Sequence, residues 1–179
     1  MEKYIALLRG INVGGKNTVS MPILKEAFEE AGFCNVRTYI NSGNVLFSSD
    51  NTDTEVLQQR CQQIIAERFN LNIPVALISP KTLAAALSNA PEWWDNDKEL
   101  KHNAIFVISP TSTETIVKEV GEINSEYEKA FYYGQIIFWS APLKTFSKTK
   151  WSKFVSVTSC SRITIRNANT TKKLLQLSE

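Results

Sequence analysis

Short apolar runs alternate along the chain with segments in which apolar residues recur every three or four positions. The runs "KYIALLRGIN", "VRTYIN", "NVLFSS" and "IPVALISP" predict strands. Between them, Met21, Leu24 and Phe28 fall on one helical face, and Leu57, Cys61, Ile64, Ile65 and Phe69 fall on another. Residues 1–80 therefore predict the order β-α-β-β-α-β, which is the ferredoxin-like pattern.

The same order recurs in the second half of the chain. "HNAIFVIS", "KAFYYG", "QIIFWS" and "RITIR" predict strands, and a helix is expected in "SKTKWSKFVSV". We therefore predict an α+β fold of two ferredoxin-like halves related by internal duplication, at 1–80 and 102–179. Residues 81–101 would hold a connecting helix and loop, and "TTKKLLQL" would form a short C-terminal helix.

Polar residues mark where these helices begin. Ser20 is a candidate N-cap with Pro22 in the first turn, and Gly32 is a candidate stop. Capping boxes are predicted at 52–55 and 111–114. The predicted strands "YIALL", "AIFVI" and "IIFW" are apolar on both faces, so both faces of each sheet should be covered. The two halves could cover each other, which we favour, or a second copy could do so, giving a monomer or a homodimer.

Composition excludes several classes of protein. The 179 residues are 43% hydrophobic, and no apolar run approaches the roughly 20 residues of a membrane span. We expect a cytoplasmic protein without a membrane segment. Cys34, Cys61 and Cys160 are widely spaced, which disfavours zinc or a disulfide framework, so no metal or cofactor is expected.

Charge is distributed unevenly. Nine of the 20 basic residues, but only one of the 18 acidic residues, lie between Lys129 and Glu179. This split is compatible with an anionic partner such as nucleic acid. A solvated basic surface, or attraction between the two halves, is the simpler explanation.

The glycine-rich segment "GINVGGKN" at 10–17 resembles a phosphate-binding P-loop but differs at decisive positions. Asn17 replaces the hydroxyl residue that reaches Mg²⁺, and the next helix begins near Met21, about one turn late. Gly10, Gly14 and Gly15 can still form a turn whose N–H groups face an anion. The alternative is a connection in which the glycines serve only the turn.

Topology brings a second polar turn to the same place. In the predicted order, the end of the first strand shares a sheet edge with the hairpin after the second strand, at 41–44. Ordinary hairpin chemistry would also explain the Asn and Gly residues there. The candidate ligand-binding residues are polar or glycine positions in these turns and in the basic tail: Arg9, Asn12, Gly14, Gly15, Lys16, Asn41, Ser42, Gly43, Asn44, Arg166, Asn167 and Thr170.

The segments "YIALLRGINVGGKN" and "VRTYINSGNVLFSS", with the tail "ITIRNANTTKKLLQL", resemble the domain of unknown function 1697 family of bacterial proteins. Ala168 departs from the aromatic residue common in the tail motif. The resemblance covers essentially the whole chain and implies a cytosolic protein with two related α+β halves. It supplies no reaction.

Three functions remain open. The first is binding of a small anionic ligand, such as a phosphorylated metabolite or nucleotide, at 9–17 and 41–44. The second is RNA binding through sheet aromatics, for which the candidates are Phe47, Phe106, Phe138 and Trp139. The third is a protein-interaction module using Trp93 and Trp94, although these rings could instead fold back onto the core.

No catalytic constellation is identified. The single histidine, His102, lies beside a predicted strand, where a structural role is the simpler interpretation. The "SKTK" segment at 147–150 lacks the companion motifs of penicillin-binding enzymes. Whether the protein is an enzyme therefore stays open.

Overall fold

The computed structural model divides the chain into two compact units and describes residues 1–157 and 161–179. The first unit is Met1–Leu83 together with Leu174–Glu179, and the second is Ala84–Lys173. These bounds differ from the predicted 1–80, 81–101 and 102–179, because most of the connecting segment packs with the second unit and the end of the last helix packs with the first. Cys160 lies outside the described residues.

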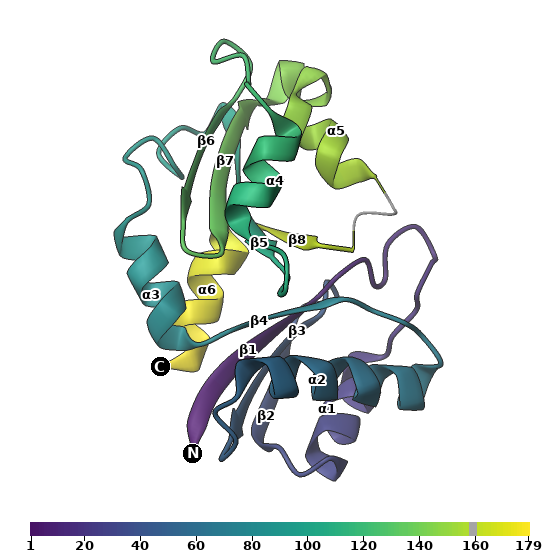
Figure 1. Cartoon of the computed structure of the whole chain (residues 1–179). Coiled ribbons are helices and arrows are strands. Elements are labelled where there is room, and N and C mark those ends of the chain that lie inside the picture. The colour runs from purple at the N-terminus through teal and green to yellow at the C-terminus, as the bar shows by residue number, and fades with distance from the viewer. Residues whose placement is uncertain (158–160) are drawn as a thin grey trace. The chain divides into compact units, whose positions relative to one another are not determined.

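The first unit contains one four-stranded sheet whose neighbouring strands are all antiparallel, in the order β2-β3-β1-β4. Its elements follow in the order β1 (Glu2–Leu8), α1 (Met21–Glu30), β2 (Cys34–Tyr39), β3 (Asn44–Ser49), α2 (Thr54–Phe69) and β4 (Val75–Ile78). The helix α3 (Pro80–Ser88) comes next. Helices α1 and α2 lie on one face of this sheet (Figure 1).

Strand β1 is buried on both faces, as its apolar pattern predicted. Tyr4, Ala6 and Leu8 belong to the cluster that packs under α1 and α2. Ile5 and Leu7 point to the opposite face and are completely buried. The end of the last helix belongs to this unit, and Lys3 Nζ donates a hydrogen bond to the carbonyl of Ser178 at 3.0 Å. A central strand with no exposed face explains why the sequence shows no polar alternation there.

The first two helices differ in how their N-termini are capped. Ser20 is the N-cap of α1 with Pro22 in its first turn, but its side chain makes no capping hydrogen bond. The cap of α2 is Asp53, one residue after the predicted Thr52, and its carboxylate accepts the amides of Glu55 and Val56. The predicted capping box at 52–55 was therefore wrong by one residue, because the Asp53 carboxylate, rather than the Thr52 hydroxyl, accepts these amides.

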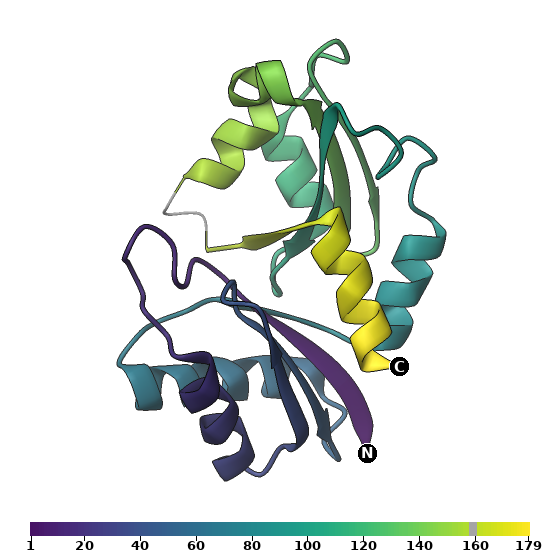
Figure 2. The same cartoon turned by 180° about the vertical axis from the view of Figure 1, so that it is seen from behind.

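The second unit also contains a four-stranded sheet with antiparallel neighbours, in the order β6-β7-β5-β8. Its elements are β5 (Leu100–Val107), α4 (Thr113–Val120), β6 (Lys129–Tyr133), β7 (Ile136–Pro142), the 3₁₀ helix η1 (Leu143–Lys148), α5 (Lys150–Ser156), β8 (Ile163–Asn167) and α6 (Ala168–Ser178). The same elements are seen from behind in Figure 2. The chain is thus a mixed α+β protein with two four-stranded antiparallel sheets.

Two boundaries in the second unit correct the sequence prediction. The cap of α4 is Ser112, one residue after the predicted Thr111, and its hydroxyl accepts the amide of Thr115. The single helix expected over 147–157 is instead the end of η1 followed by α5, with Thr149 as the new N-cap. Thr149 has an extended backbone and accepts the amide of Ser152, which interrupts the helix between them.

Glu128 is a buried carboxylate that joins α5 to the sheet. It is 3% exposed. Its two carboxylate oxygens accept the backbone amides of Lys150 and Trp151 at 2.8 and 3.2 Å and the indole Nε1 of Trp139 at 3.1 Å. The carboxylate thus satisfies the first two amides of α5 and a buried indole at once, and these three donors replace the hydration that Glu128 loses on burial.

Trp94 packs onto the core, which agrees with the interpretation that the tryptophan rings fold back rather than form an exposed interaction surface. Its ring meets Phe138 edge-on with centroids 4.9 Å apart, and its Nε1 donates to the carbonyl of Asn103 at 2.9 Å. Trp93 is half-buried. Trp93 and Trp94 therefore do not form the fully exposed pair that an interaction module was expected to present.

Candidate functional site

More than half of residues 10–17, in the loop that follows β1, have left-handed backbone. Within 10–17, five residues have positive φ: Gly10, Asn12, Gly14, Gly15 and Asn17. Three of them are glycines, and asparagine is among the side chains that tolerate this region best. The sequence "GINVGGKN" therefore specifies the loop conformation residue by residue.

Asn12 holds the loop against the rest of the unit. Its side-chain amide donates to the carbonyls of Val19 and Asn41, both at 2.9 Å, and its side-chain oxygen accepts the Val19 amide at 2.8 Å. The bond to Asn41 joins the loop to the hairpin between β2 and β3. Asn17 adds a bond from its side chain to the Gly10 carbonyl at 3.0 Å. These bonds hold the loop in one conformation without any ligand.

The tip of the loop is a small hairpin that points into solvent. The Lys16 amide donates to the Val13 carbonyl at 3.0 Å, and Gly14 and Gly15 between them have φ of 58° and 75°. Two successive positive φ values are those of a type I′ turn. Val13 is 66% exposed, and the three residues after it are exposed as well. Rigid backbone thus presents a lysine and two glycines.

The 41–44 hairpin packs tightly beneath this loop. A Cβ on Gly43 would lie 2.7 Å from Cδ1 of Ile11 and 2.8 Å from Cβ of Leu8. The side chain of Asn44 is completely buried and donates to the Tyr39 carbonyl and the Ser42 hydroxyl at 2.8 and 3.2 Å. Gly43 and Asn44 therefore have a structural role, because they hold the hairpin against the loop at 10–17.

The structure brings nine of the twelve predicted residues into this one region of the first unit. Of these, Asn12, Asn41, Gly43 and Asn44 use their polar groups or their small size to hold the two turns together. Gly14, Gly15 and Lys16 form the exposed tip. Arg9 is half-buried, and its amide donates to the Pro74 carbonyl at 2.9 Å.

Sequence reasoning missed Ile40 as a member of this region. Ile40 lies directly before Asn41, has a φ of 49°, and is 46% exposed. A β-branched residue in the left-handed region is a true outlier, and such strain is concentrated at functional positions. Nothing in the sequence signals the backbone conformation of Ile40.

The other three predicted residues, Arg166, Asn167 and Thr170, belong to the second unit. The Arg166 guanidinium donates to the Thr164 hydroxyl at 3.0 Å and to the Ile165 carbonyl at 2.7 Å. Burial lowers the pKa of Arg166 to about 10, because a charged group loses its hydration there.

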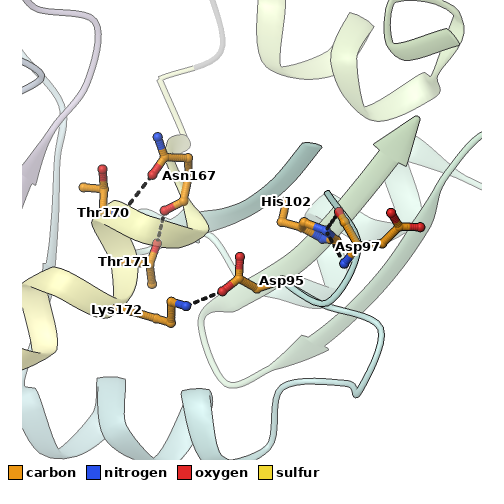
Figure 3. A network of polar contacts seen from close by, with 7 residues as sticks. All are labelled: Asp95, Asp97, His102, Asn167, Thr170, Thr171 and Lys172. Atoms are coloured by element: carbon orange, nitrogen blue, oxygen red, sulfur yellow. Dashed lines mark hydrogen bonds and ion pairs between the residues drawn. The ribbon is translucent and has the colours of Figure 1, made fainter. Parts of the chain in front are cut away.

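Asn167 begins α6 (Figure 3). Its side-chain oxygen accepts the Thr170 amide at 2.8 Å, and its carbonyl accepts the Thr171 hydroxyl at 2.9 Å. One turn further, Lys172 forms an ion pair with Asp95. The Asn-Thr motif of the tail thus has a direct structural explanation as a helix cap.

His102 on β5 lies opposite Ser140 on β7, and their side chains are hydrogen-bonded. Figure 3 shows His102 with its other partner, Asp97. Nδ1 lies 2.6 Å from the Ser140 hydroxyl, and Nε2 lies 2.7 Å from the backbone carbonyl of Asp97. A serine and histidine at this distance could form a nucleophilic pair. Ser140 is only 1% exposed, however, and within residues 1–157 and 161–179 no carboxylate orients the ring, so the pair joins β5 to β7.

A cavity of about 300 Å³ lies in the first unit, outside the two turns. Its lining includes Lys3, Arg37, Ser48 and the last residues of α6, and none of the predicted site residues. Lys3 and Arg37 donate to carbonyls of Ser178 and Leu177 at 3.0 and 3.4 Å. Both cations therefore stabilise the carboxyl end of α6.

The described residues contain neither a metal-binding cluster nor a helix that could span a membrane. No group of three or more histidine, cysteine or acidic side chains is placed to hold a metal ion in residues 1–157 and 161–179. Over the same residues, every helix is too short or too polar to cross a membrane.

Comparison with known proteins gives a family match and a structural neighbour. Residues 1–138 match the family model described as "Protein of unknown function (DUF1697)". A solved structure described as conserved bacterial protein SP0830 from Streptococcus pneumoniae is 30% identical, with a TM-score of 0.87 over 99% of each chain. No curated protein matches the chain.

Proposed function

Since the chain belongs to the DUF1697 family of proteins of unknown function, we propose from its own geometry that it binds a small anionic ligand at the 13–16 turn. The ligand class is a phosphorylated metabolite or a nucleotide. The observation that carries the proposal is a preordered loop with an exposed lysine at its tip.

The loop supports anion binding through groups that its own structure leaves unused. In the described part of the chain, no carboxylate lies within ion-pair distance of Lys16, and no acceptor takes the amides of Gly14 and Gly15. An ammonium and backbone amides are the donors that phosphate groups prefer. Exposed Val13 and Ile40 add apolar surface for the organic part of such a ligand.

Preorganisation makes this arrangement effective. Asn12 fixes the loop through three hydrogen bonds, so a ligand would not have to order flexible backbone when it binds. The strained φ of Ile40 is maintained beside the same bonds. A turn that served only to connect β1 to α1 would not require either feature.

The two units also support a common origin. In each unit the strands follow the same spatial order: second, third, first, fourth. We propose that both halves are ferredoxin-like and arose by duplication. RNA binding by base stacking is less well supported, because Phe47, Phe106, Phe138 and Trp139 are all at most 2% exposed.

The binding proposal is tested by NMR titration of the full chain with inorganic phosphate, a nucleoside monophosphate and a sugar phosphate. The amide signals of Gly14 and Gly15 should move on addition of at least one of these ligands. Lys16→Ala should weaken that binding about tenfold, as expected for loss of one charge-assisted hydrogen bond.

Lys81→Ala is the matched control, because Lys81 is also exposed and has no ion pair among the described residues. It should leave binding unchanged. Equal weakening by both variants would mean that net charge rather than the turn attracts the ligand. Absence of any shift at Gly14 and Gly15 with all three ligands would refute the proposal.

A further inference from the structure

The outer strand of the second unit, β6, presents three consecutive aromatic side chains to solvent. Phe131, Tyr132 and Tyr133 are 45%, 39% and 41% exposed. β6 pairs with β7 on one side only, so its other side is a sheet edge. Natural sheets protect such edges with prolines, bulges or charges. β6 has no proline and a regular register, and its one charged residue is Lys129 at the start.

The β6–β7 hairpin determines which backbone groups face outward. Tyr133 pairs with Ile136 across the two-residue turn 134–135. Residues that flank such a turn exchange hydrogen bonds, and hydrogen-bonded pairs then alternate along the ladder. The backbone groups of Phe131 and Lys129 therefore also face β7.

By the same alternation, the N–H and C=O groups of Ala130 and Tyr132 face away from the sheet. Each of these two residues offers one N–H donor and one C=O acceptor to a neighbouring strand, and one residue lies between them. A strand that pairs with this edge needs donors and acceptors on every second residue, and β6 of a second copy has them.

We propose that β6 pairs antiparallel with β6 of a second copy of the chain, around a two-fold axis at Phe131. In this register, Ala130 of each copy forms a hydrogen-bonded pair with Tyr132 of the other. All five residues of β6 in one copy are then paired with residues of β6 in the other copy. The result is a continuous eight-stranded sheet through two second units, with closed two-fold symmetry.

The side chains favour a second copy as the partner. Lys129 of one copy lies opposite Tyr133 of the other, which places an ammonium next to an aromatic ring. The large Tyr132 lies opposite the small Ala130. The two Phe131 side chains meet at a pair without hydrogen bonds, where opposed side chains are closest. The Lys129–Tyr133 pairs are therefore complementary in charge, and the Ala130–Tyr132 pairs are complementary in size.

The experiment is sedimentation velocity on the full chain, from about 10 μM to about 1 mM, since an interface of one short strand gives a weak complex. The wild type should shift from the 20.2 kDa monomer toward twice that mass as concentration rises. Phe131→Glu places two carboxylates at the axis and should abolish the shift, with at least tenfold weaker association.

Tyr133→Glu distinguishes this register from general stickiness of the aromatic strand. The new carboxylate would lie opposite Lys129, so the dimer should persist and become sensitive to salt. Leu143→Glu is the control, because Leu143 is 52% exposed and lies outside β6. It should behave as the wild type. Unchanged far-UV circular dichroism and thermal unfolding would show that every variant is folded.

Three results would overturn the proposal. The first is a wild type that remains monomeric at all concentrations. The second is a dimer that survives Phe131→Glu. The third is equal dissociation by Phe131→Glu and Tyr133→Glu, which would show that the strands do not meet in this register.

Discussion

Gly43 is the position where the candidate site depends most directly on the absence of a side chain. Its φ is 86°, in the left-handed region, and an added Cβ would lie 2.7 Å from Ile11 and 2.8 Å from Leu8. Left-handed backbone costs a residue with a side chain about 1–2 kcal/mol. Overpacking against Leu8 Cβ, which is fixed to its strand, adds about 1–3 kcal/mol. We expect Gly43→Ala to lower the free energy of unfolding by about 3 kcal/mol.

Gly15→Ala separates the two contributions. Gly15 has a φ of 75°, but no atom of the described residues lies within 4 Å of an added Cβ. This variant should lose only the backbone contribution of about 1–2 kcal/mol. The difference between the two variants therefore measures the close packing of the hairpin against the loop.

Urea unfolding followed by far-UV circular dichroism is the appropriate assay. All four tryptophans lie in the second unit, so their fluorescence would not report the first. If Gly43→Ala proves no more destabilising than Gly15→Ala, the two turns are not packed as described.

Three further predictions concern other parts of the chain. Glu128→Gln should destabilise the second unit by about 2 kcal/mol in urea unfolding followed by tryptophan fluorescence, because one amide oxygen cannot accept three buried N–H groups; wild-type stability would contradict this. The pKa of Glu119 is lowered mainly by hydrogen bonds from Arg162, so Arg162→Gln should raise it in an NMR titration. The stability from this pair is present above the ordinary carboxyl pKa and is lost as pH falls through the lowered value, and identical pH–stability curves for wild type and variant would argue against it. Cys34 is exposed, whereas burial raises the pKa of the Cys61 thiol; alkylation followed by peptide mass mapping should label Cys34 first, and equal labelling would be inconsistent with a closed core.

Most of the helices and strands followed from local pattern. Leu57, Cys61, Ile64 and Ile65 were predicted to share one helical face and are all buried. The family resemblance was confirmed by the match over residues 1–138. These features depend on side chains a few residues apart, so a sequence contains the information that determines them.

The candidate site was predictable in part. Connectivity alone predicted that the loop after the first strand would meet the 41–44 hairpin, and the bond from Asn12 to the Asn41 carbonyl joins them. The sequence did not distinguish side chains that build the loop from those that it exposes. That distinction depends on which carbonyl each amide reaches after folding.

The chain by itself determined the left-handed loop at 10–17, because glycine and asparagine are placed where only such residues adopt positive φ without a large penalty. Tertiary structure alone decided the burial of Glu128 and the exposure of β6. Glu128 is buried where three N–H donors converge, and the aromatic side chains of β6 are exposed on the outer strand of their sheet. Both conditions involve residues far apart in the sequence, and no local pattern contains them.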